Sequence, residues 1–282
     1  MNDDVRVWVD GELNSGSQAR IGALDHAVTV GDAAFETLKI VDGTPFATSR
    51  HLRRMQRTLA GLGLPPADGD RIAEGIAVVL SVGDPIAFGR LRYTVSSGAG
   101  PLGSDRGGAP LTYIVTASPA ARPPGTAAIV TVPWTRNERA ATAGLKTTSY
   151  AENVIALAYA HQRGAIEAIF ANTREQLCEA TGSNIFLVRA GQILTPSLAA
   201  GCLAGVTREL TIEWARSAGM TVLEEDVSMQ EAHFADEVFL TSTTKDVLGV
   251  HAWDERTYEA PGPVTAGIAE VFAMRAAAGM DP

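Results

Sequence analysis

The stretch Ala143-Gly-Leu-Lys-Thr-Thr-Ser-Tyr-Ala-Glu-Asn153 places a lysine among small and hydroxyl residues, directly before the start of a predicted amphipathic helix. Lysine is scarce in this chain, because only three of the 23 basic residues are lysines, at Lys39, Lys146 and Lys245. Chemistry that needs a lysine amine, such as Schiff-base formation, therefore has three candidates. The local pattern leaves open that Lys146 is a surface lysine at the end of a strand.

The composition of the 282 residues excludes several classes of protein. The 23 basic and 32 acidic residues give a formal net charge of −9, which lacks the basic footprint of a nucleic-acid-binding protein. Apolar runs such as Ile76–Leu80 are too short to span a membrane, and Met1–Asp4 lacks the basic-then-apolar layout of a signal peptide. Two cysteines and five histidines show no disulfide framework and no metal-ligand spacing. We expect a cytoplasmic protein with reduced thiols that binds neither nucleic acid, membrane nor metal.

The first part of the chain predicts strands, two helices and a long loop. Alternating apolar residues predict strands at 5–9, 35–41, 91–95 and 111–117, with tight turns at Asp10-Gly11 and Asp42-Gly43. Apolar spacing of three and four residues predicts one helix from Ser49, which can cap it, to about Leu62, and a second over 70–82. The Gly/Pro-rich segment 97–110 predicts a long loop of the kind that lines functional sites.

The stretch Ser118-Pro-Ala-Ala-Arg-Pro-Pro-Gly125 is the best candidate for a domain boundary, since it continues neither a helix nor a strand. We expect a small N-terminal α/β domain at 1–118, a linker at 119–126 and a larger C-terminal α/β domain at 127–282. The second part predicts strands at 127–132, around Ala168, at 183–188 and at 237–241, and helices at 150–163, 206–218 and 264–278. The fold class is therefore α+β in two domains.

Two segments of the second domain have residues suited to a phosphate. In Gly201-Cys-Leu-Ala-Gly-Val-Thr-Arg-Glu-Leu210 a turn of small residues precedes a helix, so the N–H groups of Val206 and Thr207 and the Thr207 hydroxyl would suit an anion. The alternative is an ordinary Thr-capped helix. In Thr241-Ser-Thr-Thr-Lys245 hydroxyl donors and a lysine follow a strand, and the alternative is a solvated turn.

A carboxylate and a Gly-containing bend precede a strand in Glu179-Ala-Thr-Gly-Ser-Asn-Ile-Phe186. Alone, Glu179 would be an acid in a turn. One lysine, one carboxylate and two phosphate-binding segments together match the needs of pyridoxal 5'-phosphate (PLP), whose enzymes use a Schiff-base lysine and an acid beside the ring nitrogen.

With these motifs the chain resembles the class IV aminotransferases, the fold-type IV PLP enzymes typified by D-amino-acid aminotransferase. The resemblance covers nearly the whole chain, and its motifs occur in the family's order. They are Gly31-Asp-Ala-Ala-Phe-Glu-Thr-Leu38, His51-Leu-Arg-Arg-Met55, Leu145-Lys146, Glu179–Phe186, Gly205-Val-Thr-Arg208 and Phe239-Leu-Thr-Ser-Thr-Thr244.

The resemblance implies a role for each matching residue. Lys146 matches the lysine that carries the cofactor, and Glu179 matches the acid at the pyridine nitrogen. The phosphate would be held by Arg54, Val206, Thr207, Ser242 and Thr243. Tyr150 lies near the tyrosine that some members direct at the phenolic oxygen of the ring, although the Lys-to-Tyr spacing is one residue shorter than in branched-chain enzymes. The family's members form homodimers, so we expect one here.

Three reactions share this scaffold: amino transfer to branched-chain L-amino acids, amino transfer to D-amino acids, and conversion of 4-amino-4-deoxychorismate to 4-aminobenzoate and pyruvate in folate synthesis. The branched-chain enzymes carry Gly-Gly-Asn-Tyr where this chain has Thr147–Tyr150. The D-amino-acid enzymes carry an Arg-x-His pair where this chain has Leu102 and Ser104, unless Arg106 substitutes.

Phe35-Glu-Thr-Leu38 and the pair Glu152-Asn153 resemble the lyases, so the lyase is the reaction that the sequence favours. An inactive PLP-binding homologue is the remaining alternative, but it would be expected to have lost Lys146 or Glu179, and both are present. Whether Phe35, Glu36 and Tyr93 line a substrate pocket or pack in the core stays open at this point.

Overall fold

The structure is a computed structural model that describes residues 5–282. The expectation about Met1–Asp4 therefore lies outside the described residues. The chain folds into two compact units. The first comprises Met1–Arg122, Leu145–Ser149 and Met280–Pro282, and the second comprises Pro123–Gly144 and Tyr150–Gly279. The units thus differ from the contiguous domains 1–118 and 127–282, because the segment around Lys146 and the chain end pack with the first unit.

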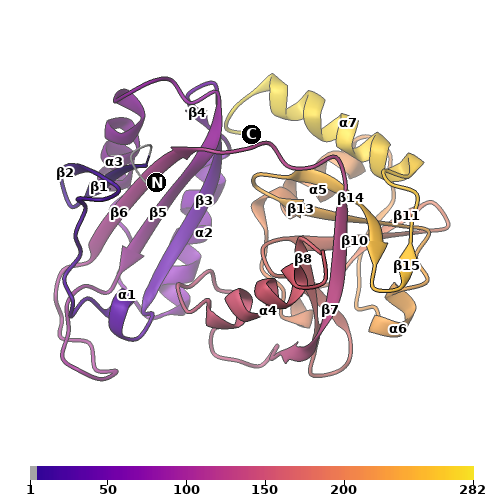
Figure 1. The fold of residues 1–282 in the computed structure, drawn as a ribbon, viewed down its shortest axis with the longest axis horizontal. Coiled ribbons are helices and arrows are strands. Elements are labelled where there is room, and N and C mark those ends of the chain that lie inside the picture. The colour runs from indigo at the N-terminus through magenta and orange to yellow at the C-terminus, as the bar shows by residue number, and fades with distance from the viewer. Residues whose placement is uncertain (1–4) are drawn as a thin grey trace. The chain divides into compact units, whose positions relative to one another are not determined.

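The first unit is a six-stranded sheet with two main helices (Figure 1). The strand order is β2-β1-β6-β5-β3-β4 and every pairing is antiparallel. Its elements are β1 (Arg6–Val9), β2 (Glu12–Ser15), α1 (His26–Thr29), β3 (Ala33–Val41), β4 (Thr44–Pro45), α2 (Thr48–Gly61), α3 (Gly69–Ser81), β5 (Phe88–Ser96) and β6 (Thr112–Pro119). The predicted turns are confirmed, since Asp10, Gly11, Asp42 and Gly43 all have positive φ.

One face of this sheet is apolar and is covered by α2 and α3. Leu38, Leu91 and Val115 lie on that face and are at most 1% exposed. Successive residues of a strand point to opposite faces, so Glu36 and Tyr93, which are cross-strand partners, also lie on the helix-covered face. Both are buried. The sequence left open whether Glu36 and Tyr93 line a substrate pocket or pack in the core. In the structure both pack in the core.

Helix α2 has a different N-terminus from the predicted one. The prediction that Ser49 caps the helix is wrong, because the N-cap is Ala47 in the left-handed conformation. The Ser49 N–H and hydroxyl instead donate to the carboxylate of Asp281, at 2.9 and 2.5 Å. A carboxylate at a helix N-terminus is stabilised by the helix dipole, so the end of the chain caps α2.

The second unit contains a nine-stranded mixed sheet in the order β12-β11-β10-β13-β14-β7-β8-β9, with β15 paired to β14. Because β9 also contacts β10, the sheet curls back on itself around an apolar interior that includes Ile129, Ile169, Leu240 and Trp253. Its strands are β7 (Ala127–Arg136), β8 (Glu167–Asn172), β9 (Leu177–Ala180), β10 (Asn184–Arg189), β11 (Gln192–Thr195), β12 (Val222–Glu224), β13 (Glu237–Ser242), β14 (Asp246–Trp253) and β15 (Arg256–Thr257).

Helices cover the outside of this curled sheet (Figure 1). Helices α5 and α7 pack on β13 through Ile212, Ile268 and Phe239, and α4 packs on β7 and β8 through Ala156 and Phe170. The helical elements are α4 (Ala151–His161), η1 (Leu198–Ala200), α5 (Val206–Ser217), α6 (Met229–Ala232) and α7 (Pro263–Ala278). Among residues 5–282, no helix has the length and apolar character needed to cross a bilayer.

Helix α3 lies so close to the first sheet that Gly75 has no room for a side chain. A Cβ there would lie 2.6 Å from Val115 Cγ2 and 2.8 Å from Trp8 Cε3. We expect Gly75→Val to lower the free energy of unfolding by about 1–3 kcal/mol, because overpacking shifts core side chains. Ala77→Val, on the exposed side of the same helix, is the control. Thermal denaturation of both variants measures the effect, and equal midpoints would contradict it.

Candidate active site

Lys146 is held by the edge of β3 rather than by a turn on the surface. Its carbonyl accepts a hydrogen bond from the Phe35 N–H at 3.0 Å, and the Thr148 N–H donates to the Ala33 carbonyl at 2.8 Å. The hydroxyls of Thr148 and Ser149 donate to the Gly31 carbonyl at 3.0 and 3.1 Å. The main chain on both sides of Lys146 is therefore fixed.

The Lys146 amine lies against an aromatic ring. Its Nζ is 4.3 Å from the centroid of Phe35, and Cζ of Arg92 is 3.7 Å from the same centroid. A cation over a ring face is stabilised by the ring's quadrupole. The Phe35 side chain thus fixes where the amine stands. Lys146 is half-buried, and its main chain is bonded to β3.

The other two lysines have different surroundings. The ammonium of Lys245 donates to Glu167 and, at 3.3 Å, to Ser183 Oγ. Lys39 is 5% exposed, with its Nζ 4.5 Å from the centroid of Phe46. Because Lys245 is already bound to a buried carboxylate, it is a poor candidate for a nucleophilic amine.

Arg54 belongs to a buried charged cluster with Glu36 and His51. Its Nε and Nη2 donate to the two carboxylate oxygens of Glu36 at 2.8 and 2.6 Å, and His51 Nδ1 lies 2.7 Å from Glu36 Oε2. Burial raises the pKa of Glu36, but Arg54 and His51 outweigh it and lower the pKa to about 2. Burial also lowers the pKa of His51, so the neutral ring donates through Nδ1–H. Because the Nε–Nη2 edge of Arg54 faces Glu36, the Nη1 side of Arg54 points away from the Glu36 carboxylate.

The long loop at 97–110 contains Arg106, the possible substitute for a carboxylate-binding pair. Its Nε and Nη2 donate to the two oxygens of Asp32, both at 2.6 Å. This bidentate hydrogen bonding lowers the pKa of Asp32. Arg106 is therefore paired within its own unit, and Leu102 at the first of the two expected positions is 84% exposed.

In the second unit, Glu179 lies in β9 rather than in a turn. Its Oε2 accepts a hydrogen bond from the Leu203 N–H at 2.9 Å, and its Oε1 is 3.6 Å from Nε of Arg136. The Glu179 side chain is 15% exposed. A backbone N–H and a guanidinium therefore both face the Glu179 carboxylate.

Arg136 is a residue that the sequence did not single out. Its guanidinium lies 4.3 Å from the centroid of Phe170, and its Nη1 donates to Glu152 and, at 3.2 Å, to Asn153 Oδ1. Asn153 Nδ2 in turn donates to the Thr181 carbonyl at 2.5 Å. The pair Glu152-Asn153 therefore positions Arg136 beside Glu179. No sequence signal finds Arg136, because it reaches Glu179 only through the pairing of β7 with β8 and of β8 with β9.

The predicted anion site at Val206 and Thr207 is the first turn of α5. The N-cap is Gly205, a residue that has no side chain to cap the helix. The alternative of a Thr-capped helix is therefore wrong. A Cβ at Gly205 would lie 2.0 Å from Asn184 Oδ1, and Asn184 Nδ2 donates to the Leu203 carbonyl at 2.8 Å. The main chain of Leu203 is thus bound by Asn184 at its carbonyl and by Glu179 at its N–H, which brings the Glu179–Phe186 motif to the start of α5.

The hydroxyl-rich segment joins the same region. Ser242 ends β13, Thr243 lies in the turn to β14, and Thr241 is the ladder partner of Asn184. Thr241 shares a strand face with Phe239, which packs on α5. Its buried Oγ1 has no hydrogen-bond partner among the described residues. A buried donor without a partner beside the uncapped N-terminus of α5 fits an anionic ligand.

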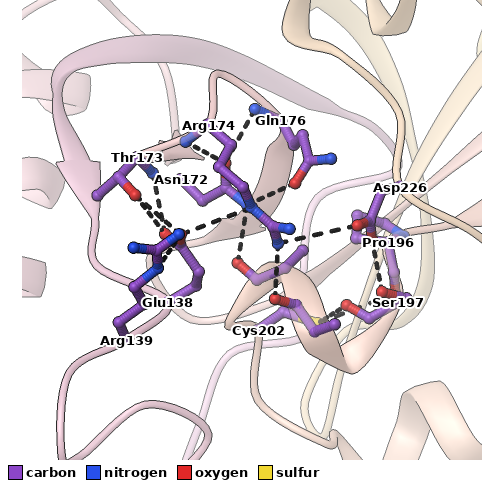
Figure 2. A network of polar contacts seen from close by, with 12 residues as sticks. Glu138, Arg139, Asn172, Thr173, Arg174, Gln176, Pro196, Ser197, Cys202 and Asp226 are labelled. Carbon is purple, nitrogen blue, oxygen red and sulfur yellow. Dashed lines mark hydrogen bonds and ion pairs between the residues drawn. The ribbon is translucent and has the colours of Figure 1, made fainter.

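A polar network holds the segment that leads into this region (Figure 2). Glu138 accepts from the Thr173 hydroxyl at 2.8 Å and lies 3.5 Å from Nε of Arg174. Arg174 donates to the Ala199 carbonyl at 3.0 Å, and the Asn172 amide donates to the Ala200 carbonyl at 3.4 Å. The segment before Leu203 is therefore tied to the β8–β9 hairpin.

Tyr150, the tyrosine predicted near the ring's phenolic oxygen, is the half-buried N-cap of α4. Arg54 and Lys146 belong to the first unit, and Tyr150, Glu179, Val206, Thr207, Ser242 and Thr243 belong to the second. Within the second unit the structure brings Glu179, the start of α5 and the end of β13 together.

Comparison with known proteins identifies the class. The family model for class IV aminotransferases matches residues 33–253, so the chain belongs to that family, whose members are PLP-dependent enzymes. D-alanine aminotransferase from Bacillus licheniformis is 28% identical over 276 residues, 94% of each chain. The branched-chain aminotransferase of Thermoproteus uzoniensis, solved with norvaline, superposes with a TM-score of 0.87 at 26% identity, covering 95% of this chain and 93% of the other.

A Legionella pneumophila structure provisionally named a 4-amino-4-deoxychorismate lyase has a TM-score of 0.84 at 23% identity, covering 92% of this chain and 96% of the other. At that identity it shows the shared fold. The predicted α+β, fold-type IV class is confirmed by these structures.

The Glu36 cluster predicts an acid-dependent stability. Because the pKa of Glu36 falls from an ordinary 4.5 to about 2 on folding, its contribution is complete above pH 4.5 and is lost as the pH falls toward 2. This lowering of the Glu36 pKa on folding corresponds to about 3 kcal/mol of unfolding free energy. Glu36→Gln should flatten the dependence of unfolding free energy on pH in this window, measured by urea denaturation. Glu74→Gln, exposed on α3, is the control. An unaltered slope in Glu36→Gln would contradict the assignment.

Proposed function

We propose that this class IV enzyme is an aminotransferase that holds PLP with the residues that the resemblance implied. The observation that supports this most is the position of Glu179: its carboxylate accepts from the Leu203 N–H, lies 3.6 Å from Arg136 Nε, and stands beside the helix N-terminus that begins at Gly205. The ring nitrogen of PLP needs an acid as its partner. The phosphate of PLP needs a cluster of N–H and hydroxyl donors. Arg54, Val206, Thr207, Ser242 and Thr243 would hold the phosphate, and Tyr150 would face the phenolic oxygen.

Bound PLP would supply a positively charged, electron-withdrawing ring conjugated to the substrate nitrogen, which acidifies the hydrogen on the adjacent carbon. The role of Glu179 is to keep a proton on the ring nitrogen. The negative charge of the carboxylate would favour the protonated ring nitrogen. Arg136, itself held by Glu152 and Asn153, helps to position this carboxylate.

Lys146 would bind the cofactor through its amine and, once released, move the proton. An amine can accept a proton from carbon at Nζ and return it at another position, as a general base and then a general acid. The hydrogen bonds of Lys146 and Thr148 to β3 fix the start of this side chain, and the Phe35 ring fixes its end.

The structure changes the balance between the candidate reactions. Glu36 and the pair Glu152-Asn153 resembled the lyases, but Glu36 binds Arg54 and the pair binds Arg136. Arg106, the possible carboxylate group for D-amino acids, is paired with Asp32. The T. uzoniensis relative is named a branched-chain aminotransferase. We therefore favour amino transfer between branched-chain L-amino acids and 2-oxo acids, with the lyase reaction as the second candidate.

A homodimer and a cytoplasmic location remain proposals that the family resemblance and the composition support.

We expect Lys146→Ala to abolish turnover, a loss of at least roughly 10²–10⁴-fold, and to remove the yellow absorbance of lysine-bound cofactor, because the amine both binds PLP and moves the proton. Absorbance spectra and borohydride trapping with peptide mapping measure this directly. Lys39→Met is the matched control and should keep both properties. Yellow absorbance retained in Lys146→Ala, or a trapped tag on another lysine, would contradict the assignment.

A substrate panel distinguishes the reactions. L-leucine and L-glutamate should each convert bound cofactor to its amine form, while D-alanine should not, and aminodeoxychorismate should yield no 4-aminobenzoate. Absorbance follows the cofactor, and chromatography follows the aminobenzoate. Formation of 4-aminobenzoate without cofactor conversion would establish the lyase, and conversion by D-alanine alone would establish a D-amino-acid enzyme.

A further inference from the structure

Lys245 stands in the segment Thr241–Lys245 but has no role in the proposed chemistry. Its ammonium donates to Glu167 Oε1 and to Ser183 Oγ, the latter at 3.3 Å. The Lys245 side chain is 20% exposed and the Glu167 side chain 3%. The ion pair is therefore largely removed from water.

Glu167 collects donors from a second turn as well. Its carboxylate accepts from the Thr181 hydroxyl, from the Gly182 N–H at 2.9 Å and from the Ser183 hydroxyl at 2.7 Å. Burial raises the pKa of Glu167, but Lys245 and the two hydroxyls lower it below the ordinary value. One ionised carboxylate thus binds two separate turns, 181–183 and 243–245.

Both turns adjoin groups of the candidate site. Turn 181–183 joins β9, which carries Glu179, to Asn184, which binds the Leu203 carbonyl. The other turn contains Thr243 and follows Ser242, and the Lys245 N–H donates to the Ser242 carbonyl at 3.2 Å. The register that pairs Asn184 with Thr241 brings the two turns to the same end of β10 and β13.

We propose that the ion pair between Glu167 and Lys245 positions the phosphate-binding hydroxyls. By tying turn 243–245 to turn 181–183, it holds Ser242 and Thr243 in place relative to the first turn of α5. This inference rests on the proposed function, in which the hydroxyls of Ser242 and Thr243 hold the phosphate of PLP. Glu167 and Lys245 are positioning residues and touch no reacting atom.

The energetics of buried ion pairs separate this role from a purely stabilising one. Replacing both partners by apolar residues of similar size is often neutral for stability, whereas removing one partner leaves an uncompensated buried charge. Glu167→Gln with Lys245→Met removes both charges and the connection between the turns, and the new amide oxygen can still accept from turn 181–183, so the fold is retained. What is lost is the geometry that charge-assisted hydrogen bonds impose on the turns.

The experiment compares the binding of PLP and of pyridoxal, which lacks the phosphate, to the apo forms of the full chain. The variants are Lys245→Met and the double variant Glu167→Gln with Lys245→Met, and Lys39→Met is the control for loss of a lysine. We expect the double variant to unfold near the wild-type midpoint and to bind pyridoxal as the wild type does. Its dissociation constant for PLP should rise about tenfold to a hundredfold.

Lys245→Met should be less stable than the double variant; if it does not fold, the double variant carries the test. A wild-type ratio of PLP to pyridoxal affinity in the double variant would overturn the inference. Equal losses for both ligands, or a double variant that does not fold, would show a merely structural ion pair and also overturn it. A wild-type chain that binds neither ligand would instead overturn the proposed function itself.

Discussion

The hydrogen bond from the Leu203 N–H to the Glu179 carboxylate is the contact on which the candidate site depends. It joins a strand of the curled sheet to the segment that begins α5, while Asn184 holds the carbonyl of the same residue. One residue, bound at both its N–H and its carbonyl, places an acid and a helix N-terminus side by side. Its position is secured from behind by the network of Glu138, Asn172 and Arg174 (Figure 2).

Buried or half-buried carboxylates paired with a basic side chain recur in both units. Glu36 meets Arg54, Glu167 meets Lys245, and Glu179 meets Arg136. Each of these pairs fixes two side chains in one geometry. A fixed geometry is needed where a charged group of a ligand is bound at a defined position. The shared feature suits a family whose cofactor presents an anionic group and a basic ring nitrogen.

Much of the secondary structure could be predicted from local pattern. Helices α2, α3, α4, α5 and α7 were found because apolar residues recur at helical spacing. Strands β9, β11 and β12 were missed because three or four residues carry too little alternation to be distinguished from turns. Strand β14 begins at Asp246 in the left-handed conformation and contains Gly249, both of which argue against a strand by sequence. The Ser49 cap failed because a competing partner, Asp281, comes from the far end of the chain.

By itself the sequence determined which chemical groups exist and the local conformation around them: three lysines, an acid before a Gly-containing bend, and a glycine opening a helix. Those properties depend on residue type and near neighbours, so they can be predicted without knowledge of the fold. Only the tertiary structure decided the partners. Arg136 reaches Glu179 because β8 lies between their strands, pairing Arg136 with Asn172 and Phe170 with Glu179. Strand register of this kind is set by the packing of the whole sheet, which no local pattern encodes.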